Sequence, residues 1–126
     1  MRQKILVVDD EPTVRKAMAR ELRLEFDISL AASPLDALAL LDEGGDFCAV
    51  VSDLMMSGPT GIELLEEVRR RAPACARVLV SGSVVDSEIP AVLRSGAVQE
   101  VVCKPWQRGE LLAAVRGLVG ERPRET

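Results

Sequence analysis

The hydrophobic and polar positions of the chain follow two alternating patterns. Short runs of consecutive apolar residues are typical of buried strands, and the longer stretches between them repeat apolar residues at helical spacing. The first such stretch places Val14, Ala17, Met18 and Leu22 on one helix face. The pattern predicts strands over residues 4–8, 27–32, 48–52, 77–81 and 99–103, and helices over residues 12–25, 33–43, 61–72, 87–96 and 107–119.

The alternation of strands and helices predicts right-handed crossover units and therefore a parallel sheet. The runs "KILVV", "AVV" and "VLV" are apolar at consecutive positions, as expected for strands that helices cover on both faces. The sequence thus predicts an α/β fold, a doubly wound five-stranded parallel sheet with five helices. We expect one domain over residues 1–120, with residues 121–126 as a charged tail or the start of a linker.

Helix-start signals support part of this assignment. Pro12 suits the first position of a helix. Ser33 is expected to cap the next helix, and Asp36 completes a capping-box pattern with it. The helix over residues 87–96 has the weakest signal, because Pro90 falls near its first turn.

Charge and composition exclude several classes of partner. The net charge of −4 argues against nucleic acid as a direct partner, because phosphate binding needs a basic face. We therefore interpret the run "EEVRRR" at residues 66–71 as the solvated face of a helix. No apolar run reaches the length of a bilayer, and "MRQKILVVDDEP" lacks the long apolar segment of a signal peptide. We expect a cytoplasmic protein with no membrane partner.

The cysteines and the absence of histidine limit the chemistry further. Cys48, Cys75 and Cys103 show no CxxC spacing, and since two of them lie in strand-like runs we expect small core residues in a reducing cytosol. The sequence has no histidine, which excludes Ser-His-Asp and Cys-His nucleophile pairs and histidine zinc sites. Any chemistry must then use carboxylates, hydroxyls and lysines.

Polar residues follow four of the five predicted strands. Because the carboxyl ends of parallel strands share one edge of a sheet, we expect these residues to converge on one crevice. Clustered carboxylates repel each other, and Mg²⁺ would relieve that repulsion with oxygen ligands alone. A carboxylate nucleophile, Mg²⁺ and a lysine are the parts needed for phosphoryl transfer. The residues are Asp9, Asp10 and Glu11 after the first strand, Asp53 after the third, Ser81 after the fourth, and Lys104 and Pro105 after the fifth.

Each of these residues also has a purely structural interpretation. Asp10 and Glu11 could cap the helix that begins at Pro12. Asp53 could merely start a turn, and Ser81 could be a loop former. Lys104 could be a surface lysine, and we expect Trp106, which follows Pro105, to be a packing residue. The convergence on one sheet edge favours the functional interpretation.

The chain resembles the response-regulator receiver domain of two-component signal transduction over residues 3–119. The resemblance rests on "VVDDE" (7–11), "SDLMMSGPTGIELL" (52–65), "VLVSG" (78–82) and "VCKPW" (102–106), in this order and spacing. It implies a flavodoxin-like sheet of order 2-1-3-4-5. It also implies a phosphoprotein in which a sensor histidine kinase or phosphotransfer protein forms an aspartyl phosphate on Asp53.

The resemblance assigns a role to each matching residue. Asp10 and Asp53 would bind Mg²⁺ directly, Asp9 would act through water, and the backbone carbonyl of Met55 would complete the coordination. Two further groups, Ser81 and Lys104, would hold the phosphoryl oxygens. Ser81 and Gly82 would move during switching, and the Lys104–Pro105 bond would be cis. The output surface would consist of the fourth helix, fifth strand and fifth helix, facing an output domain or target protein.

Several positions depart from the family pattern. Ser57 stands where receivers usually have proline, and "PT" (59–60) replaces Met-Asp before Gly61. Val101 occupies the position of the usual Tyr or Phe, whose ring swings inward on activation. Valine carries no ring, so we expect a switch that uses backbone and loop shifts or Trp106. Met55 and Ser83 occupy positions that tune the lifetime of the phosphoryl group in the family. Their identities do not define a rate for this chain.

Three functions therefore compete. The first is a phosphorylation-controlled regulatory module that assists its own modification and is not otherwise an enzyme. The second is a pseudo-receiver, a binding module of the same fold that never carries phosphate. The third is a haloacid-dehalogenase-like phosphatase, which would need a second acid two residues after the nucleophile, where this chain has Met55.

Overall fold

The sheet of the computed structural model, which describes residues 2–56, 58–82 and 86–120, has five strands. Their order is β2-β1-β3-β4-β5, and every neighbouring pair is parallel. This confirms the predicted fold class and strand order. The strands are β1 (Lys4–Val8), β2 (Asp27–Ala31), β3 (Phe47–Asp53), β4 (Ala76–Ser81) and β5 (Glu100–Cys103).

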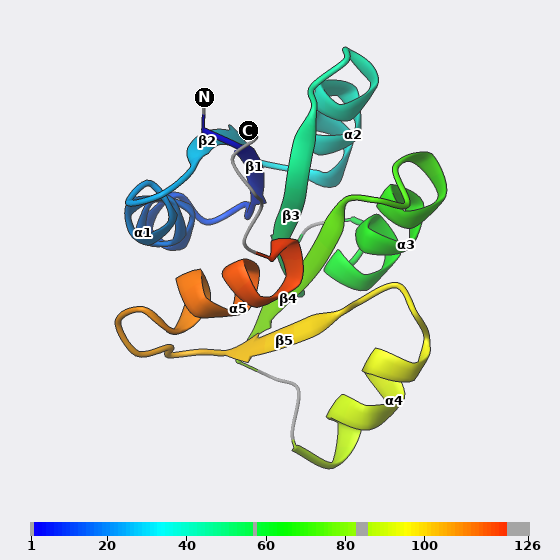
Figure 1. Ribbon diagram of the computed structural model, residues 1–126. Coiled ribbons are helices and arrows are strands. Elements are labelled where there is room, and N and C mark those ends of the chain that lie inside the picture. Colours follow the sequence, from blue (N-terminus) through cyan, green and yellow to red (C-terminus); the bar gives the residue numbers. More distant parts are fainter. Residues whose placement is uncertain (1, 57, 83–85, 121–126) are drawn as a thin grey trace.

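Helices cover both faces of the sheet (Figure 1). Helices α1 and α5 pack on one face, and α2, α3 and α4 on the other. A single 3₁₀ turn, η1 (Asp86–Glu88), precedes α4 in the described chain. The α-helices are α1 (Pro12–Leu22), α2 (Pro34–Asp42), α3 (Gly61–Arg71), α4 (Ile89–Arg94) and α5 (Glu110–Val119).

Each face of the sheet has its own hydrophobic core. On the α1–α5 face, Met18 and Leu22 of α1 are fully buried beside Leu111 of α5. On the opposite face, Leu65 and Val68 of α3 are fully buried. The strands between the two cores are apolar at consecutive positions for this reason.

All five α-helices are shorter than predicted, and the differences are largest at α1, α4 and α5. Helix α1 ends at Leu22, because a turn closed by Phe26 N donating to Leu22 O brings Phe26 into the core. Helix α5 begins at Glu110 and not at residue 107, because Gly109 before it is left-handed, with a φ of 86°. Such a φ is open to glycine at little steric cost.

The predicted Ser33 cap and the position of Pro12 at the start of α1 are confirmed, but the capping box at Ser33 is incomplete. The Ser33 hydroxyl accepts a hydrogen bond from Asp36 N at 3.1 Å, which is only half of a capping box. The complete box lies at α3, where Thr60 Oγ1 accepts from Glu63 N and Glu63 Oε1 accepts from Thr60 N. The aspartate at residue 36 is one methylene shorter than the glutamate that forms this box.

Helix α4 is the least anchored of the α-helices. It has no buried residue, and Pro90 lies in its first turn as the sequence indicated. A buried arginine instead holds the segment that follows it. Arg77, 5% exposed, donates to the carbonyls of Gly96 and Ala97 after α4 and to those of Pro73 and Cys75 before β4.

The cysteines are free, but the two that lie in strands are not the most buried ones, contrary to the expectation that they are core residues. Cys75, just before β4, is 3% exposed, whereas Cys48 and Cys103 in the strands are only partly buried. Burial raises the pKa of the Cys75 thiol to about 12, so this thiol stays protonated near neutral pH. Cys48 is less buried because it sits where the β1–β3 register shifts.

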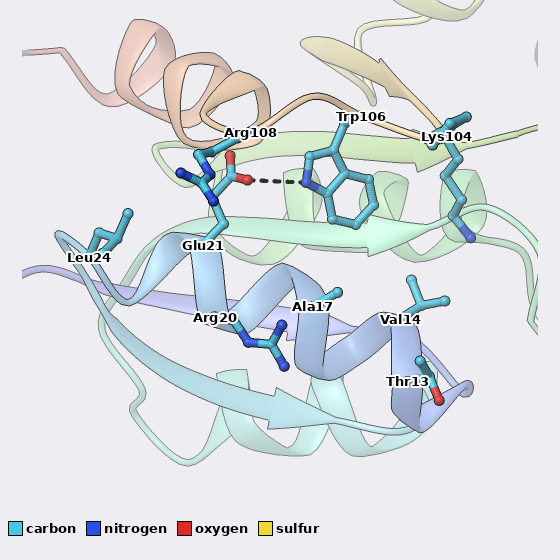
Figure 2. A pocket seen from close by; sticks show the side chains of 10 residues that line it. Thr13, Val14, Ala17, Arg20, Glu21, Leu24, Lys104, Trp106 and Arg108 are labelled. Atoms are coloured by element: carbon cyan, nitrogen blue, oxygen red, sulfur yellow. Dashed lines mark hydrogen bonds between the residues drawn. The ribbon is translucent and has the colours of Figure 1, made fainter.

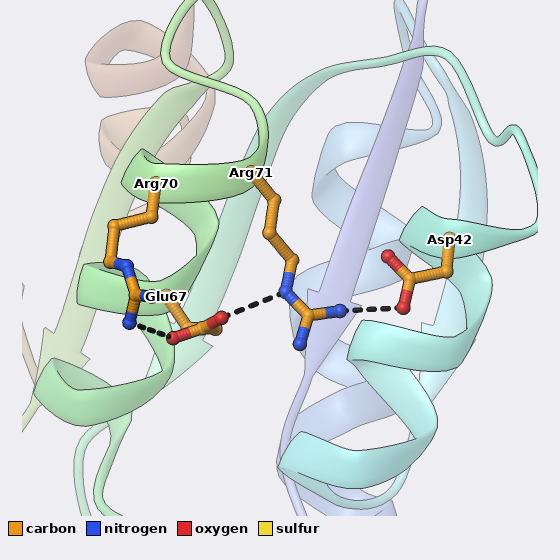
Figure 3. A network of polar contacts seen from close by, with 4 residues as sticks. All are labelled: Asp42, Glu67, Arg70 and Arg71. Carbon is orange, nitrogen blue, oxygen red and sulfur yellow. Dashed lines mark hydrogen bonds and ion pairs between the residues drawn. The ribbon is translucent and has the colours of Figure 1, made fainter.

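The charged run of α3 is a solvated face, as expected. Glu67 accepts hydrogen bonds from Arg70 and Arg71, and Arg71 also reaches Asp42 of α2 (Figure 3). Exposed pairs of this kind contribute little stability. In the described part of the chain, every helix is too short or too polar to cross a membrane.

Candidate functional site

The polar residues predicted to converge do lie along the carboxyl edge of the sheet. The register pairs Val8 with Ser52, Asp53 with Val80, and Ser81 with Cys103. The residues at the ends of β1, β3, β4 and β5 therefore lie side by side. They are Asp9, Asp53, Ser81 and Lys104.

The Asp53 carboxylate is 5% exposed and is held on both oxygens. Its Oδ1 lies 2.6 Å from Lys104 Nζ, and its Oδ2 accepts a hydrogen bond from Met55 N at 3.1 Å. The hydrogen bond from Met55 N is the one that an aspartate with a purely structural role would make at the start of a turn. The contact with Oδ1 shows that Lys104 is not merely a surface lysine. Asp53 has no cation next to it in the sequence, but in the fold its carboxylate pairs with Lys104.

Asp9 is the most constrained acid of the site, at 1% exposed. Its Oδ1 accepts from Glu11 N at 2.8 Å, and its buried Oδ2 has no hydrogen-bond partner among the described residues. Burial raises the pKa of Asp9 to about 6, and the nearby charges of Asp53 and Asp10 add to the shift. The backbone N–H of Glu11 and the ammonium of Lys104 act in the opposite direction.

The capping interpretation of the residues before α1 is not supported for Glu11. Glu11 occupies the N-cap position, but its side chain makes no capping hydrogen bond. Asp10 is exposed to solvent beside the buried Asp9. Asp9 therefore supplies the local turn bond, and Asp10 faces the open side of the edge.

The loops after β4 and β5 are joined through the backbone. Ser81 is 1% exposed, and its carbonyl accepts a hydrogen bond from Lys104 N at 3.0 Å. Gly82 is exposed, and a Cβ there would lie 3.6 Å from Lys104 Cβ. The Lys104–Pro105 peptide bond is cis, as the resemblance implies. A shift at Ser81 would thus reach Lys104 directly.

Two further residues singled out in the sequence, Met55 and Val101, differ in their exposure. The Met55 side chain is 67% exposed. Val101 is partly buried against the α2–α3 core, where its branched side chain has no ring to rotate. Ser57 and Ser83 lie outside the described residues.

The donor set of this edge fits a hard divalent cation. The buried Oδ2 of Asp9, which has no partner among the described residues, and the raised pKa of Asp9 mark a poorly compensated negative charge, and carboxylate oxygens suit Mg²⁺. Within the described ranges, however, no three acidic or cysteine side chains already form a group that could hold a metal ion. Asp53 is engaged by Lys104 and Met55 in this structure.

Two features of the site were missed in the sequence. A Cβ on Gly61 would lie 2.1 Å from the Asp53 carbonyl oxygen, so glycine lets α3 begin directly against the end of β3. The "TGIE" pattern that marks this helix start is readable in the sequence. The second feature is a groove of about 940 Å³ between α1 and the segment after β5, with Trp106 and Lys104 on its wall (Figure 2).

The strand order and the two helical layers define the CheY-like form of the flavodoxin fold. A CheY-like receiver domain protein from Methanospirillum hungatei has a TM-score of 0.84 at 21% identity, covering 94% of each chain. A BeF3-activated DrrB receiver domain has a TM-score of 0.82 at 24% identity, covering 94% of this chain and 98% of that one. At this identity, the likeness shows the fold.

The chain belongs to the response regulator receiver domain family, whose model matches residues 5–116. The hydrogenase transcriptional regulatory protein HoxA of Cupriavidus necator is 35% identical over 115 residues, 91% of this chain and 24% of that protein. The transcriptional regulatory protein TcrA of Mycobacterium tuberculosis is 34% identical over 122 residues, 95% of this chain and 47% of that protein. The chain thus spans about a quarter to a half of the length of these relatives.

Proposed function

We propose that Asp53 is the phosphoacceptor of a two-component signalling domain. A sensor histidine kinase or phosphotransfer protein would supply the phosphoryl group in a Mg²⁺-dependent reaction. The observation that carries this proposal is the ion pair of the buried Asp53 Oδ1 with Lys104 Nζ at 2.6 Å, beside an Asp9 oxygen that has no partner among the described residues. Phosphoryl transfer depends mostly on positioning and charge neutralisation, which this edge provides.

Each residue has a defined part in this proposal. Asp10, Asp53 and the Met55 carbonyl would hold Mg²⁺, with Asp9 acting through water. When bound, the ion would neutralise charge on the transferring group. The Lys104 ammonium, which now pairs with the Asp53 carboxylate, would bind one of the new phosphoryl oxygens. The Ser81 hydroxyl would donate a hydrogen bond to another. An Asp53 carboxylate oxygen would attack the phosphorus and form the acyl phosphate bond, while the N–P bond to the donor's phosphohistidine breaks and the imidazole leaves.

Phosphorylation would then shift the domain between two surfaces. The new group carries about −1.5 to −2 charges. A change from 1:99 to 99:1 needs about 5.5 kcal/mol of differential stabilisation. Two or three charge-assisted hydrogen bonds of about 1.5–3 kcal/mol each can supply it. The output surface would be α4, β5 and α5, which would contact an output domain or target protein.

Intact-protein mass spectrometry with acetyl phosphate and Mg²⁺ tests the assignment. We expect one added phosphoryl group on the wild type, none on Asp53→Asn, and normal addition on the control Asp46→Asn, an exposed acid before β3. Labelling that persists in Asp53→Asn would overturn the assignment.

A pseudo-receiver that never carries phosphate is the second candidate. The absence of a ready three-acid group among the described residues favours it. It predicts no mass gain with any phosphodonor and an unchanged affinity for its partner. The same mass measurement therefore separates the two functions.

A further inference from the structure

The carboxylate of Glu21 in α1 accepts two hydrogen bonds from the segment that follows β5. Trp106 Nε1 donates to its Oε1 at 3.2 Å, and Leu112 N donates to its Oε2 at 2.9 Å. Figure 2 shows the Trp106 indole directed at Glu21 along one side of the groove. We call these three groups, the Glu21 carboxylate, the Trp106 indole and the Leu112 amide, the α1–α5 clasp.

The clasp caps α5 from another helix. Gly109, the N-cap residue of α5, has no side chain with which to satisfy the amides of the first turn. Leu112 N is one of these amides, which lack partners inside the helix. The Glu21 carboxylate satisfies it, and a negative charge is also favourable at the positive end of the helix. Glu21 thus fixes both Trp106 and the start of α5.

The clasp is connected to the phosphoacceptor through a short series of contacts. Trp106 follows Lys104 by two residues, and Lys104 Nζ lies 2.6 Å from Asp53 Oδ1. Lys104 N in turn bonds to the Ser81 carbonyl at 3.0 Å. Asp53 and Ser81 therefore both contact Lys104, which lies two residues before the indole that Glu21 holds.

We propose that the α1–α5 clasp couples the position of Lys104 to the α1–α5 face, so that release of Lys104 from Asp53 opens the clasp. The proposal deepens and in part rests on the proposed function, because phosphorylation would be the natural cause of that release. It replaces the ring movement that Val101 cannot make with a movement of the Trp106 indole. The closed clasp belongs to the unphosphorylated state. Opening it would uncap α5 and expose the indole in the groove.

The sequence allows a direct spectroscopic test. Trp106 is the only tryptophan and the chain has no tyrosine, so tryptophan emission reports on the clasp alone. The key variant is Glu21→Gln, whose single carbonyl oxygen replaces the two carboxylate oxygens that accept these bonds. The matched control is Glu25→Gln, which removes the exposed ion pair between Glu25, in the turn after α1, and Arg116 of α5.

The first arm needs no phosphodonor. Emission and acrylamide quenching are compared between the wild type and Lys104→Ala, with circular dichroism to confirm folding. We expect a red shift and a loss of protection from acrylamide in Lys104→Ala and in Glu21→Gln, and wild-type values in Glu25→Gln. Wild-type emission in a folded Lys104→Ala would overturn the proposal.

The second arm uses beryllofluoride with Mg²⁺ as the phosphoryl mimic. We expect the wild-type emission to shift on binding. Because coupling is reciprocal, Glu21→Gln should bind beryllofluoride about fivefold more tightly, at the low end of ordinary allosteric coupling. Fluorine NMR of the bound ligand measures that affinity. Bound beryllofluoride with unchanged Trp106 emission would refute the clasp but leave phosphorylation of Asp53 intact. If neither beryllofluoride nor phosphoryl groups bind, the proposed function fails and the first arm alone decides the clasp.

Discussion

Replacing Asp9 by asparagine should stabilise the protein at neutral pH. Asp9 is 1% exposed, its Oδ2 has no partner among the described residues, and its pKa is raised from 3.8 to about 6, mainly by burial. The asparagine side chain would keep the Oδ1 that accepts from Glu11 N and would remove the buried charge. Its amide group would also place a donor near the carboxylate of Asp53.

The magnitude follows from linkage between protonation and folding. Between pH 4 and 6 the folded state binds the proton that the unfolded state has lost, so stability falls as the pH rises through this window. A shift from 3.8 to about 6 corresponds to an upper value of about 3 kcal/mol at 1.36 kcal/mol per unit. The penalty is complete above pH 6 and absent below pH 4. Asp9→Asn should therefore gain up to about 3 kcal/mol at pH 7 and almost nothing at pH 4.

Urea unfolding between pH 4 and 8 in the absence of divalent cations measures this difference. Exposed Asp46→Asn serves as the control and should leave the pH dependence unchanged. Added Mg²⁺ should stabilise the wild type at pH 7, and should stabilise Asp9→Asn less, because the ion binds an edge with one less carboxylate. A variant that is less stable than the wild type, or equally stabilised at pH 4 and 7, would refute the reasoning.

Three further changes test how the elements around the edge are built. Thr60→Ala should lower the free energy of unfolding by about 1 kcal/mol through loss of the α3 capping box, while Thr60→Ser should not, as urea melts would show. Gly61→Ala should cost about 1–3 kcal/mol and slow phosphorylation, because its Cβ would displace the Asp53 carbonyl. Gly117→Ala, with open space around it, should instead be stabilising. Arg77→Met should cost about 2 kcal/mol or more and speed amide exchange between α4 and β5, because it leaves buried carbonyls without donors; equal exchange in both proteins would contradict this.

The existence and order of the elements could be predicted because hydrophobic periodicity extends over many residues. Some of their ends, such as that of β1, could be predicted too, but others could not, because they depend on one local conformation. Gly109 delays the start of α5 through a left-handed φ that the apolar pattern does not contain. The end of α1 depends on the burial of Phe26, which lies beyond the helical repeat. The α3 capping box was an exception, because "TGIE" contains its complete signal.

The candidate site, like the fold, could be predicted only in part from the sequence. Strand ends in a parallel sheet must share an edge, so the convergence of Asp9, Asp53, Ser81 and Lys104 followed from the strands alone. The pairing within the edge did not, because nothing along the chain says which carboxylate receives the ammonium. The bond between Glu21 and Trp106 joins residues 85 positions apart and has no local signal.

The distribution of charge along this edge links its burial to its function. Two buried carboxylates, Asp9 and Asp53, face one ammonium, and among the described residues Lys104 forms its ion pair with Asp53. The excess charge remains on Asp9, where burial raises its pKa and leaves one oxygen without a partner among the described groups. A divalent cation would remove that excess, and a phosphoryl group on Asp53 would then restore negative charge at the position that Lys104 already faces. The burial that destabilises Asp9 is therefore what would make the edge receptive to a cation and, through it, to an incoming anion.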